Sequence, residues 1–321
     1  MKEFELIGRL LAPIARAPAA RGLRDDVAVW PAPGARDIVL TKDMVAEGVH
    51  FLAQDPPEAI AAKLLRVNLS DLASKGATPE GVLLGFGLTP RQDEAWLTAF
   101  VRGLGADLER YGVQLWGGDT IQAGERMVLS LTAIGSAPAG QALSREHARA
   151  GDDLYVTGTI GDGWLGLQVL THKLDLPSEH RDFATQRYRW PQPRVELGPA
   201  LLGLARGSAD VSDGLLADAG HIADASDVSV VIKLARVPLS EAAAAWAGDD
   251  LPRRVQLATG GDDYEILFSA DPAQREAVLA LSQRFGLSIT RIGRVEAGQG
   301  LSVLGPDGTR LAVTTLGYEH G

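Results

Sequence analysis

The stretch at residues 36–51, RDIVLTKDMVAEGVHF, decides the fold expected for this chain, because an apolar strand in it changes abruptly into a series of polar groups. Residues 38–40 are typical of a strand packed on both faces, and Asp43 stands where we expect that strand to end. Thr41 lies beside it and His50 follows after a turn, so an acid, a hydroxyl and an imidazole could converge. An aspartate at a strand end often only caps a turn, and this stretch alone leaves that alternative open.

The same pattern, an apolar run that ends in Asp, recurs along the chain. The acidic turns that we predict are Asp25-Asp26, Asp43, Asp71, Gly117-Gly118-Asp119, Asp210-Val211-Ser212-Asp213 and Gly261-Asp262-Asp263. They supply oxygen donors without a His or Cys cluster beside them, which favours Mg²⁺ or Ca²⁺ over zinc or copper. Several Mg²⁺ ions held by aspartates suit a site that neutralises polyphosphate during phosphoryl transfer.

Residues 58–76 predict a helix that is apolar over most of its circumference and therefore buried. Asn68 and Asp71 interrupt it three residues apart on one side. A buried ionised carboxylate is costly unless it is paired or binds a metal, so Asp71 is a candidate metal ligand. The alternative is a salt bridge from Asp71 to Lys63 or Lys75.

Length and composition predict two domains of the α/β or α+β layered class. A chain of 321 residues exceeds one ordinary core, and strands alternate with helices in both halves. The sequence predicts helices at residues 2–20, 195–206 and 215–226, among others. The hydrophilic segment LSREHARAGDD at residues 143–153 lacks apolar periodicity. We therefore expect domains at residues 1–150 and 151–321.

Charge and residue usage exclude several classes of function. The net charge of −10 argues against a nucleic-acid backbone as partner but not against a nucleotide that binds with Mg²⁺. The absence of cysteine removes disulfides and thiolate catalysis, and no signal pattern or membrane-length apolar run occurs. The segment GTIGDG is only a weak dinucleotide signal, and GxxxxGK[ST] is absent. We expect a cytoplasmic protein without a membrane partner.

A family resemblance joins these motifs. RDDVAV, TKDMVAEGVHF, KLLRVNLSDLASKGATP, GGDT, DVSDGLLAD, GGDDYEILF and the terminal GYEH resemble, in that order, the motifs of thiamine-monophosphate kinase. That family belongs to the superfamily of aminoimidazole ribonucleotide synthetase, and the resemblance covers essentially the whole chain. It implies an N-terminal α/β domain that binds Mg-ATP and forms a homodimer, and a C-terminal α/β domain that closes the active site.

The resemblance also implies a reaction and a set of residues. ATP and thiamine monophosphate would give ADP and thiamine diphosphate by direct in-line transfer, with several Mg²⁺ ions and no general base. The implied metal ligands are Asp26, Thr41, Asp43, Asp71, Asp119, Asp210 and Asp213. The implied ATP contacts are Gly118, Asp119, Arg145 and Ser212. The implied thiamine monophosphate contacts are His50, Asp262 and Tyr318.

The chain departs from the family pattern at four positions. These are Arg24 in place of Gly, Lys42 in place of Thr, Asp262 in place of Glu, and Gly321 in place of Phe. None removes a metal carboxylate, although all bear on substrate contacts. Two other functions stay open: a superfamily member that activates an amide or formyl oxygen with ATP, and a non-catalytic subunit that binds Mg-nucleotide.

Overall fold

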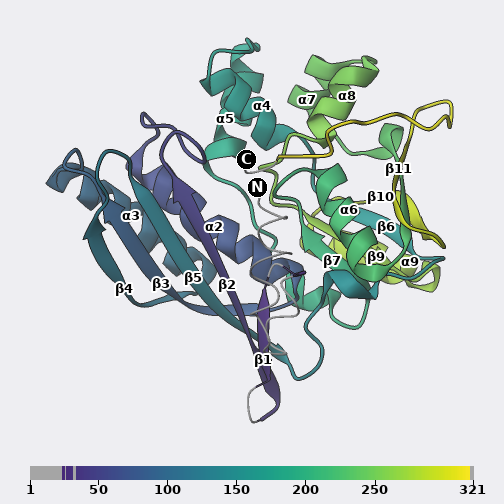
Figure 1. The fold of residues 1–321 in the computed structure, drawn as a ribbon, viewed down its shortest axis with the longest axis horizontal. Coiled ribbons are helices and arrows are strands. Elements are labelled where there is room, and N and C mark those ends of the chain that lie inside the picture. Colours follow the sequence, from purple (N-terminus) through teal and green to yellow (C-terminus); the bar gives the residue numbers. More distant parts are fainter. Residues whose placement is uncertain (1–23, 26, 32–33, 319–321) are drawn as a thin grey trace.

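A computed structural model describes residues 24–25, 27–31 and 34–318 of the chain. These residues form two mixed β-sheets with helices, and the long helix α2 (Pro57–Ser74) lies between them (Figure 1). The helix expected at residues 2–20 and the candidate metal ligand Asp26 lie outside the described residues.

The first sheet has the strand order β1-β2-β5-β3-β4, and its β3–β4 pair is parallel while the other pairs are antiparallel. Its strands are β1 (Ala28–Pro31), β2 (Arg36–Ala46), β3 (Thr78–Leu88), β4 (Gln114–Gln122) and β5 (Val128–Pro138). Helix α2 connects β2 to β3, and α3 (Glu94–Tyr111) makes the crossover between the parallel strands.

Strand β2 corrects two expectations about the opening stretch. It does not end at Asp43, because β5 pairs with it continuously from Arg36 to Ala46. It is also not packed on both faces. Val39, Thr41 and Val45 are buried, whereas the residues between them are half-buried or exposed. This alternation with a period of two gives β2 one covered face, and Thr41 and Asp43 both belong to it.

Helix α2 is buried along nearly its whole length, as its apolar circumference predicted. Its leucines pack on the first sheet and on Phe100 of α3. A salt bridge with both partners buried also joins the two helices: the Arg66 guanidinium donates to both carboxylate oxygens of Asp107, at 2.6 and 2.8 Å. The other side of α2 contacts β7 (Ala205–Asp210) and β9 (Ile266–Ala270) of the second sheet, so this one helix touches both halves of the chain.

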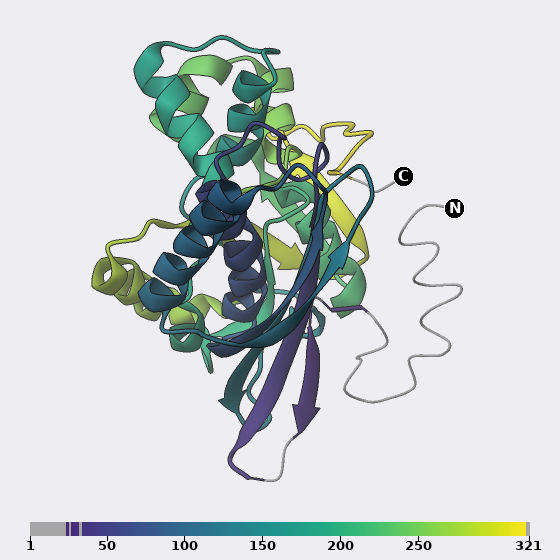
Figure 2. The same cartoon turned by 90° about the vertical axis from the view of Figure 1, so that its left-hand side faces the viewer.

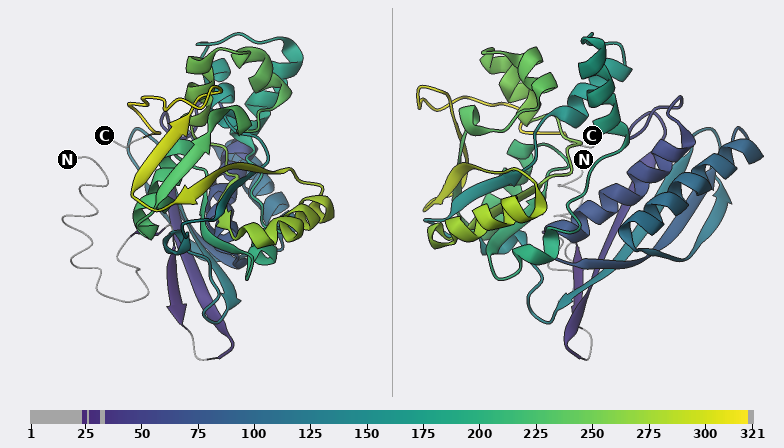
Figure 3. Two further views of the ribbon diagram at one scale, coloured as in Figure 1. Left: turned by 90° about the vertical axis from the view of Figure 1, so that its right-hand side faces the viewer. Right: turned by 180° about the vertical axis from the view of Figure 1, so that it is seen from behind.

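The two faces of the first sheet differ. Helices α2 and α3 lie over one face, and the opposite face carries no helix among the described residues (Figure 2 and Figure 3, right). Met44, Leu83 and Ile121 are each more than 40% exposed. The edge strand β4 is exposed at every position. We call this uncovered side the open face.

The second sheet has the order β11-β8-β10-β6-β9-β7. Its strands are β6 (Asp153–Thr157), β7 (Ala205–Asp210), β8 (Ser229–Lys233), β9 (Ile266–Ala270), β10 (Ile289–Glu296) and β11 (Gly300–Leu304). The helices of this half are α4 (Asp162–Leu170), α5 (Ser178–Arg189), α6 (Leu215–Ser226), α7 (Glu241–Ala247), α8 (Leu251–Ala258) and α9 (Arg275–Phe285). Short 3₁₀ turns η4 to η7 occupy Arg145–His147, Gly198–Leu201, Leu234–Arg236 and Pro272–Gln274.

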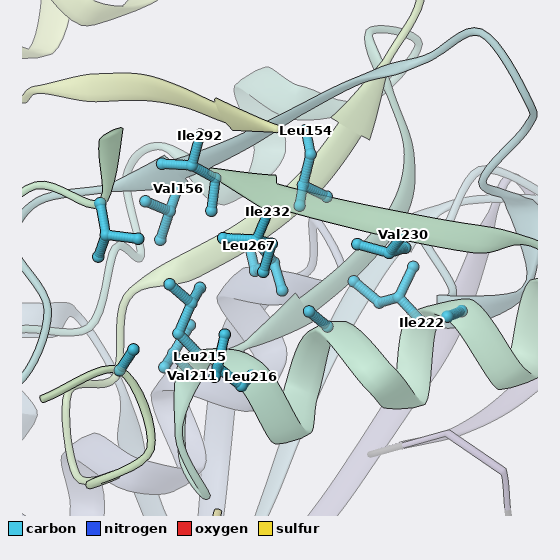
Figure 4. Packing of buried hydrophobic residues seen from close by; sticks show 14 of the residues in the cluster. Leu154, Val156, Val211, Leu215, Leu216, Ile222, Val230, Ile232, Leu267 and Ile292 are labelled. Atoms are coloured by element: carbon cyan, nitrogen blue, oxygen red, sulfur yellow. The ribbon is translucent and has the colours of Figure 1, made fainter. Parts of the chain in front are cut away.

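Apolar side chains cover both faces of this sheet. Leu154 and Val156 pack with Leu215 of α6 (Figure 4), whereas Tyr155 between them packs on the other face with Val278 of α9. Strand β6 is therefore buried at every position, as expected for a strand between two helical layers. This rigid centre fixes the strand ends that carry the acidic residues of the second half.

The mixed strand and helix architecture agrees with the predicted class, but two local expectations are wrong. Gly117-Gly118-Asp119 is not a turn and lies inside β4, where β3 pairs with it. The helix expected at residues 195–206 is absent from that described segment, which contains the turn η5 and the start of β7. Gly198, Pro199 and Gly203 explain the difference, because neither Gly nor Pro favours a helix interior.

Candidate functional site

The site is built around one side of α2. Thr41 Oγ1 on β2 donates a hydrogen bond of 2.5 Å to Asp71 Oδ2 on α2. Two residues further along β2, the backbone N–H of Asp43 donates to Asn68 Oδ1 at 3.0 Å. The period of two on the strand matches the spacing of three on the helix, so these four residues from distant parts of the sequence face each other.

The second sheet brings a further carboxylate to the same helix. Asp210 is the last residue of β7 and is almost fully buried. Its Oδ2 accepts a hydrogen bond of 2.7 Å from Ser70 Oγ, next to Asp71 in the sequence. Candidate metal ligands from the two halves of the chain therefore meet at adjacent residues of α2.

Tyr264 lies beside Asp262, because its hydroxyl donates to Asp262 Oδ1 at 2.9 Å. Burial raises the pKa of the Tyr264 phenol well above its ordinary value, and the negative charges of Asp262, Asp43 and Asp210 raise that pKa further. These three aspartates come from the second half, from β2 and from β7 respectively. The Tyr264 phenol is therefore influenced by carboxylates from both halves of the chain.

Three backbone hydrogen bonds hold the other candidate residues together. The Asp262 N–H donates to the Ser212 carbonyl at 2.8 Å, and the Tyr318 N–H donates to the Asp213 carbonyl at 2.9 Å. The Tyr264 N–H reaches the Val211 carbonyl at 2.8 Å. The candidate residues of the second half therefore lie together at the start of α6: Ser212 for ATP, Asp213 for metal, and Asp262 and Tyr318 for thiamine monophosphate.

A histidine that the sequence analysis missed lies with these residues. Ligand atoms of Asp213, Asp218 and His221 all lie within 4.8 Å of one another. Asp218 is buried, and its Oδ2 accepts a hydrogen bond from the Ser212 N–H at 3.1 Å. The sequence analysis found no His or Cys cluster beside the acidic turns, and it did not identify this single histidine next to Asp213. The signal was present, because residues three apart on a helix share one face.

His50 and Asp262 are linked through two other side chains. The Lys63 ammonium on α2 lies 3.0 Å from Asp262 Oδ2 and 3.6 Å from the centre of the Tyr188 ring. The Tyr188 hydroxyl donates to the His50 carbonyl at 3.1 Å, while His50 Nδ1 accepts from the Ala46 N–H at the same distance. Lys63 thus pairs with Asp262, Lys75 pairs with Asp25, and Asp71 accepts the Thr41 hydroxyl.

The neighbouring Asp263 has a different environment from Asp262. Its carboxylate turns inward and accepts hydrogen bonds from the N–H groups of Gly161 and Gly163, at 2.8 and 3.3 Å. Burial raises the pKa of Asp263 well above its ordinary value, and the nearby Asp162 raises it further. A Cβ at Gly163 would lie 2.1 Å from the Asp262 carbonyl oxygen, so α4 approaches this loop as closely as glycine permits. Asp263 therefore anchors the loop that presents Asp262.

Asp119 and Gly118 lie apart from this group. The strand registers place Asp119 level with Met44, three strands away. Residues in register share a face, so Asp119 belongs to the open face, whereas Asp43 faces α2. Three strand spacings of about 4.8 Å separate β4 from β2 by about 14 Å. Within the described residues, no hydrogen bond or ion pair joins Asp119 to the other candidate ligands.

Arg145 and the N-terminal acidic turn lie beside β7. Ser226 Oγ donates to the Arg145 carbonyl at 2.6 Å, which holds the turn η4 against α6. Lys75 Nζ pairs with Asp25 at 2.8 Å, with both side chains fully buried, and also donates to the Ser208 carbonyl at 2.8 Å. Asp25, the residue before Asp26, is therefore held next to β7, the strand that ends at Asp210.

Comparison with known proteins identifies the family. Residues 24–137 match the model of the AIR synthase related protein, N-terminal domain, and residues 149–305 match the corresponding C-terminal domain. The thiamine-monophosphate kinase of Caulobacter vibrioides is 42% identical over 323 residues, which cover 99% of this chain and 91% of the relative. The chain belongs to the thiamine-monophosphate kinase family.

Further relatives agree with this thiamine-monophosphate kinase membership. The Escherichia coli K12 thiamine-monophosphate kinase is 37% identical over 322 residues, which cover 99% of this chain and 98% of that protein. A solved structure of AaThiL complexed with AMPPCP and TMP has a TM-score of 0.86 at 29% identity, with 100% of this chain and 97% of that chain covered. The family, the aminoimidazole ribonucleotide synthetase-like fold and the kinase class predicted from the motifs are confirmed. No helix among the described residues is long and apolar enough to span a membrane.

Proposed function

We propose that this protein transfers the terminal phosphoryl group of ATP directly, in line, to thiamine monophosphate, and so forms thiamine diphosphate. Family membership supports the reaction, as does the solved relative complexed with AMPPCP and TMP. One observation of the chain itself carries the proposal. Carboxylates from both halves meet on α2, through the Thr41–Asp71 and Ser70–Asp210 hydrogen bonds.

The residues at this junction fit Mg²⁺. They offer carboxylate and hydroxyl oxygens, the hard ligands that Mg²⁺ prefers, and they concentrate negative charge that needs a counter-charge. The proposed ligands at the junction are Thr41, Asp43, Asp71, Asp210 and Asp213. We add Asp26, which lies outside the described residues, and Asp119, which lies on the open face where a second copy of the chain is proposed. Bound Mg²⁺ would neutralise the triphosphate and the charge that develops on the transferred group.

The chain's own residues bind and align the two substrates. A phosphate monoester is already a competent nucleophile at neutral pH, so alignment matters more than a general base. We assign ATP to Gly118, Asp119, Arg145 and Ser212. We assign thiamine monophosphate to His50, Asp262 and Tyr318, where an anionic carboxylate and an aromatic face suit a cationic thiazolium. The backbone bond between Asp262 and Ser212 supports a shared site for both substrates.

We further propose that residues 1–150 bind Mg-ATP and form a homodimer, and that residues 151–321 close the active site. A second copy of this chain on the open face accounts for the exposed Met44, Leu83 and Ile121 beside an edge strand that is exposed throughout. Asp119 lies on that same face, so this dimer brings the partner chain close to a proposed ATP contact. A cytoplasmic location, where ATP is available, suits the reaction.

The test is a product assay with the purified full-length protein. With Mg²⁺, ATP and thiamine monophosphate, we expect ADP and thiamine diphosphate in equal amounts. ADP formed with formylglycinamidine ribonucleotide but not with thiamine monophosphate would transfer the protein to the amide-activating class. Nucleotide binding without turnover on either substrate would indicate a non-catalytic subunit.

A further inference from the structure

Lys63 is a buried cation at the junction of the two halves, and the proposed mechanism assigns it no part. It lies on α2, and its side chain is only 4% exposed. A buried ammonium requires compensating partners. Lys63 has two: the Asp262 carboxylate at 3.0 Å and the face of the Tyr188 ring at 3.6 Å. Both belong to the second half of the chain, so Lys63 bridges the two halves beside a proposed substrate residue.

Asp262 is held from both sides. Its Oδ2 accepts from Lys63, and its Oδ1 accepts from the Tyr264 hydroxyl at 2.9 Å. The backbone of Asp262 has a φ of 65°, and that of Tyr264 has a φ of 54°. Two non-glycine residues in the left-handed region within three positions are unusual, and such conformations persist where surrounding contacts over-determine them, often at functional sites. Of the two side-chain contacts to Asp262, the one from Lys63 comes from the first half of the chain and the one from Tyr264 comes from the second.

The last turn of α5 extends the same connection to His50. Tyr188 is almost fully buried, and its hydroxyl donates to the His50 carbonyl at 3.1 Å. The residues on either side of Tyr188 also form ion pairs. Arg187 contacts Glu265 at 3.0 Å, and Arg189 contacts Asp55 at 2.7 Å. This turn therefore ties the loop after β2 to the loop before β9, and Lys63 stacks on its central residue.

We propose that Lys63 is a positioning residue for thiamine monophosphate: it sets the orientation of Asp262 and, through Tyr188, the place of His50. This inference rests on the proposed function of the site. The Lys63 ammonium lies 3.0 Å from Asp262 Oδ2 and holds that carboxylate in the orientation that we propose for a cationic substrate. Its loss should therefore weaken thiamine monophosphate binding while ATP binding and the transfer step remain.

The experiment is steady-state kinetics of the full-length protein with Mg²⁺, varying each substrate in turn. For Lys63→Met we expect KM for thiamine monophosphate to rise about tenfold, in the range of coupling seen between contacting residues. KM for ATP and kcat should stay within about threefold of the parent, because only contacting groups are expected to couple. Lys63→Arg, which keeps the charge, should recover part of the loss, and Lys173→Met, at an exposed lysine, is the matched control with parental kinetics.

A double-mutant cycle separates positioning from a merely structural role. The double variant, Lys63→Met with Asp262→Asn, should have a KM for thiamine monophosphate no higher than that of the single variant with the higher KM. A folded Lys63→Met protein with unchanged KM for thiamine monophosphate, or with losses that simply multiply in the double variant, overturns the inference. If Lys63→Met does not fold, Lys63→Gln decides by the same criterion. Parent protein that makes no thiamine diphosphate would instead overturn the proposed function.

Discussion

Replacing Asp71 by Asn tests the proposed metal site at the point where β2 and α2 meet. The substitution keeps the shape of the side chain but removes its negative charge and one oxygen ligand. Asp71 is 9% exposed, and its Oδ2 accepts the Thr41 hydroxyl at 2.5 Å. The amide oxygen of Asn can still accept that hydrogen bond, so the local packing survives while the chemistry changes.

We expect Asp71→Asn to change the stability of the fold little and to reduce turnover strongly. Because one acceptor remains and like charges are removed from a crowded cluster, the free energy of unfolding should change by less than about 1 kcal/mol without metal. Turnover loses a preorganised electrostatic group, and such a loss typically costs about 2.7–4 kcal/mol, or about 10²–10³-fold in kcat. The expected variant is therefore well folded and nearly inactive.

The assay measures ADP and thiamine diphosphate together with thermal unfolding, at several Mg²⁺ concentrations. Asp182→Asn on α5 is the matched control, because Asp182 is exposed and outside the site. The control should keep the parental rate and Tm. If Asp71→Asn turns over at the parental rate, Asp71 is only a buried structural residue and the reasoning is refuted.

Three further predictions concern the packing, the metal and the open face. Asp107→Asn leaves the buried Arg66 guanidinium without its ion pair and should destabilise the protein by about 3–5 kcal/mol in chemical denaturation; an unchanged transition midpoint would contradict this. Removal of Mg²⁺ by chelation should abolish turnover, and Mg²⁺ added back should restore it and raise Tm, since ligands of the native state stabilise it; full activity in chelator would contradict the metal assignment. Leu83→Asp on the open face should shift the sedimentation of the protein from dimer to monomer without lowering Tm of the fold, and a parental sedimentation profile would contradict the proposed interface.

Local patterns in the sequence predicted the central helices well. The apolar circumference of α2 and the Gly214-to-Leu215 start of α6 are properties of neighbouring residues, so periodicity and turn chemistry are sufficient to locate them. Strand lengths were less predictable. Strand β2 continues past Asp43 because β5, almost 90 residues later in the chain, pairs with it along its entire length.

The site shows the same division between local and long-range information. The motifs predicted which residues carry the chemistry, and the structure pairs Thr41 with Asp71 and Asp210 with Ser70, the neighbour of Asp71 in the sequence. The supporting contacts could not be read from the sequence, since Lys63 and Asp262 are 199 residues apart. The place of Asp119 on the open face follows from strand register, which the Gly-Gly-Asp motif does not encode.

The most direct test of the proposed metal site is the anomalous diffraction of Mn²⁺ in crystals grown with a non-hydrolysable ATP analogue and thiamine monophosphate. Mn²⁺ takes oxygen ligands of the same kind as Mg²⁺ and can be located without ambiguity. The account predicts anomalous peaks in direct contact with Asp71 from the first half and Asp210 from the second, next to the triphosphate. Peaks confined to surface carboxylates, with the junction on α2 empty while the nucleotide is bound, would contradict it.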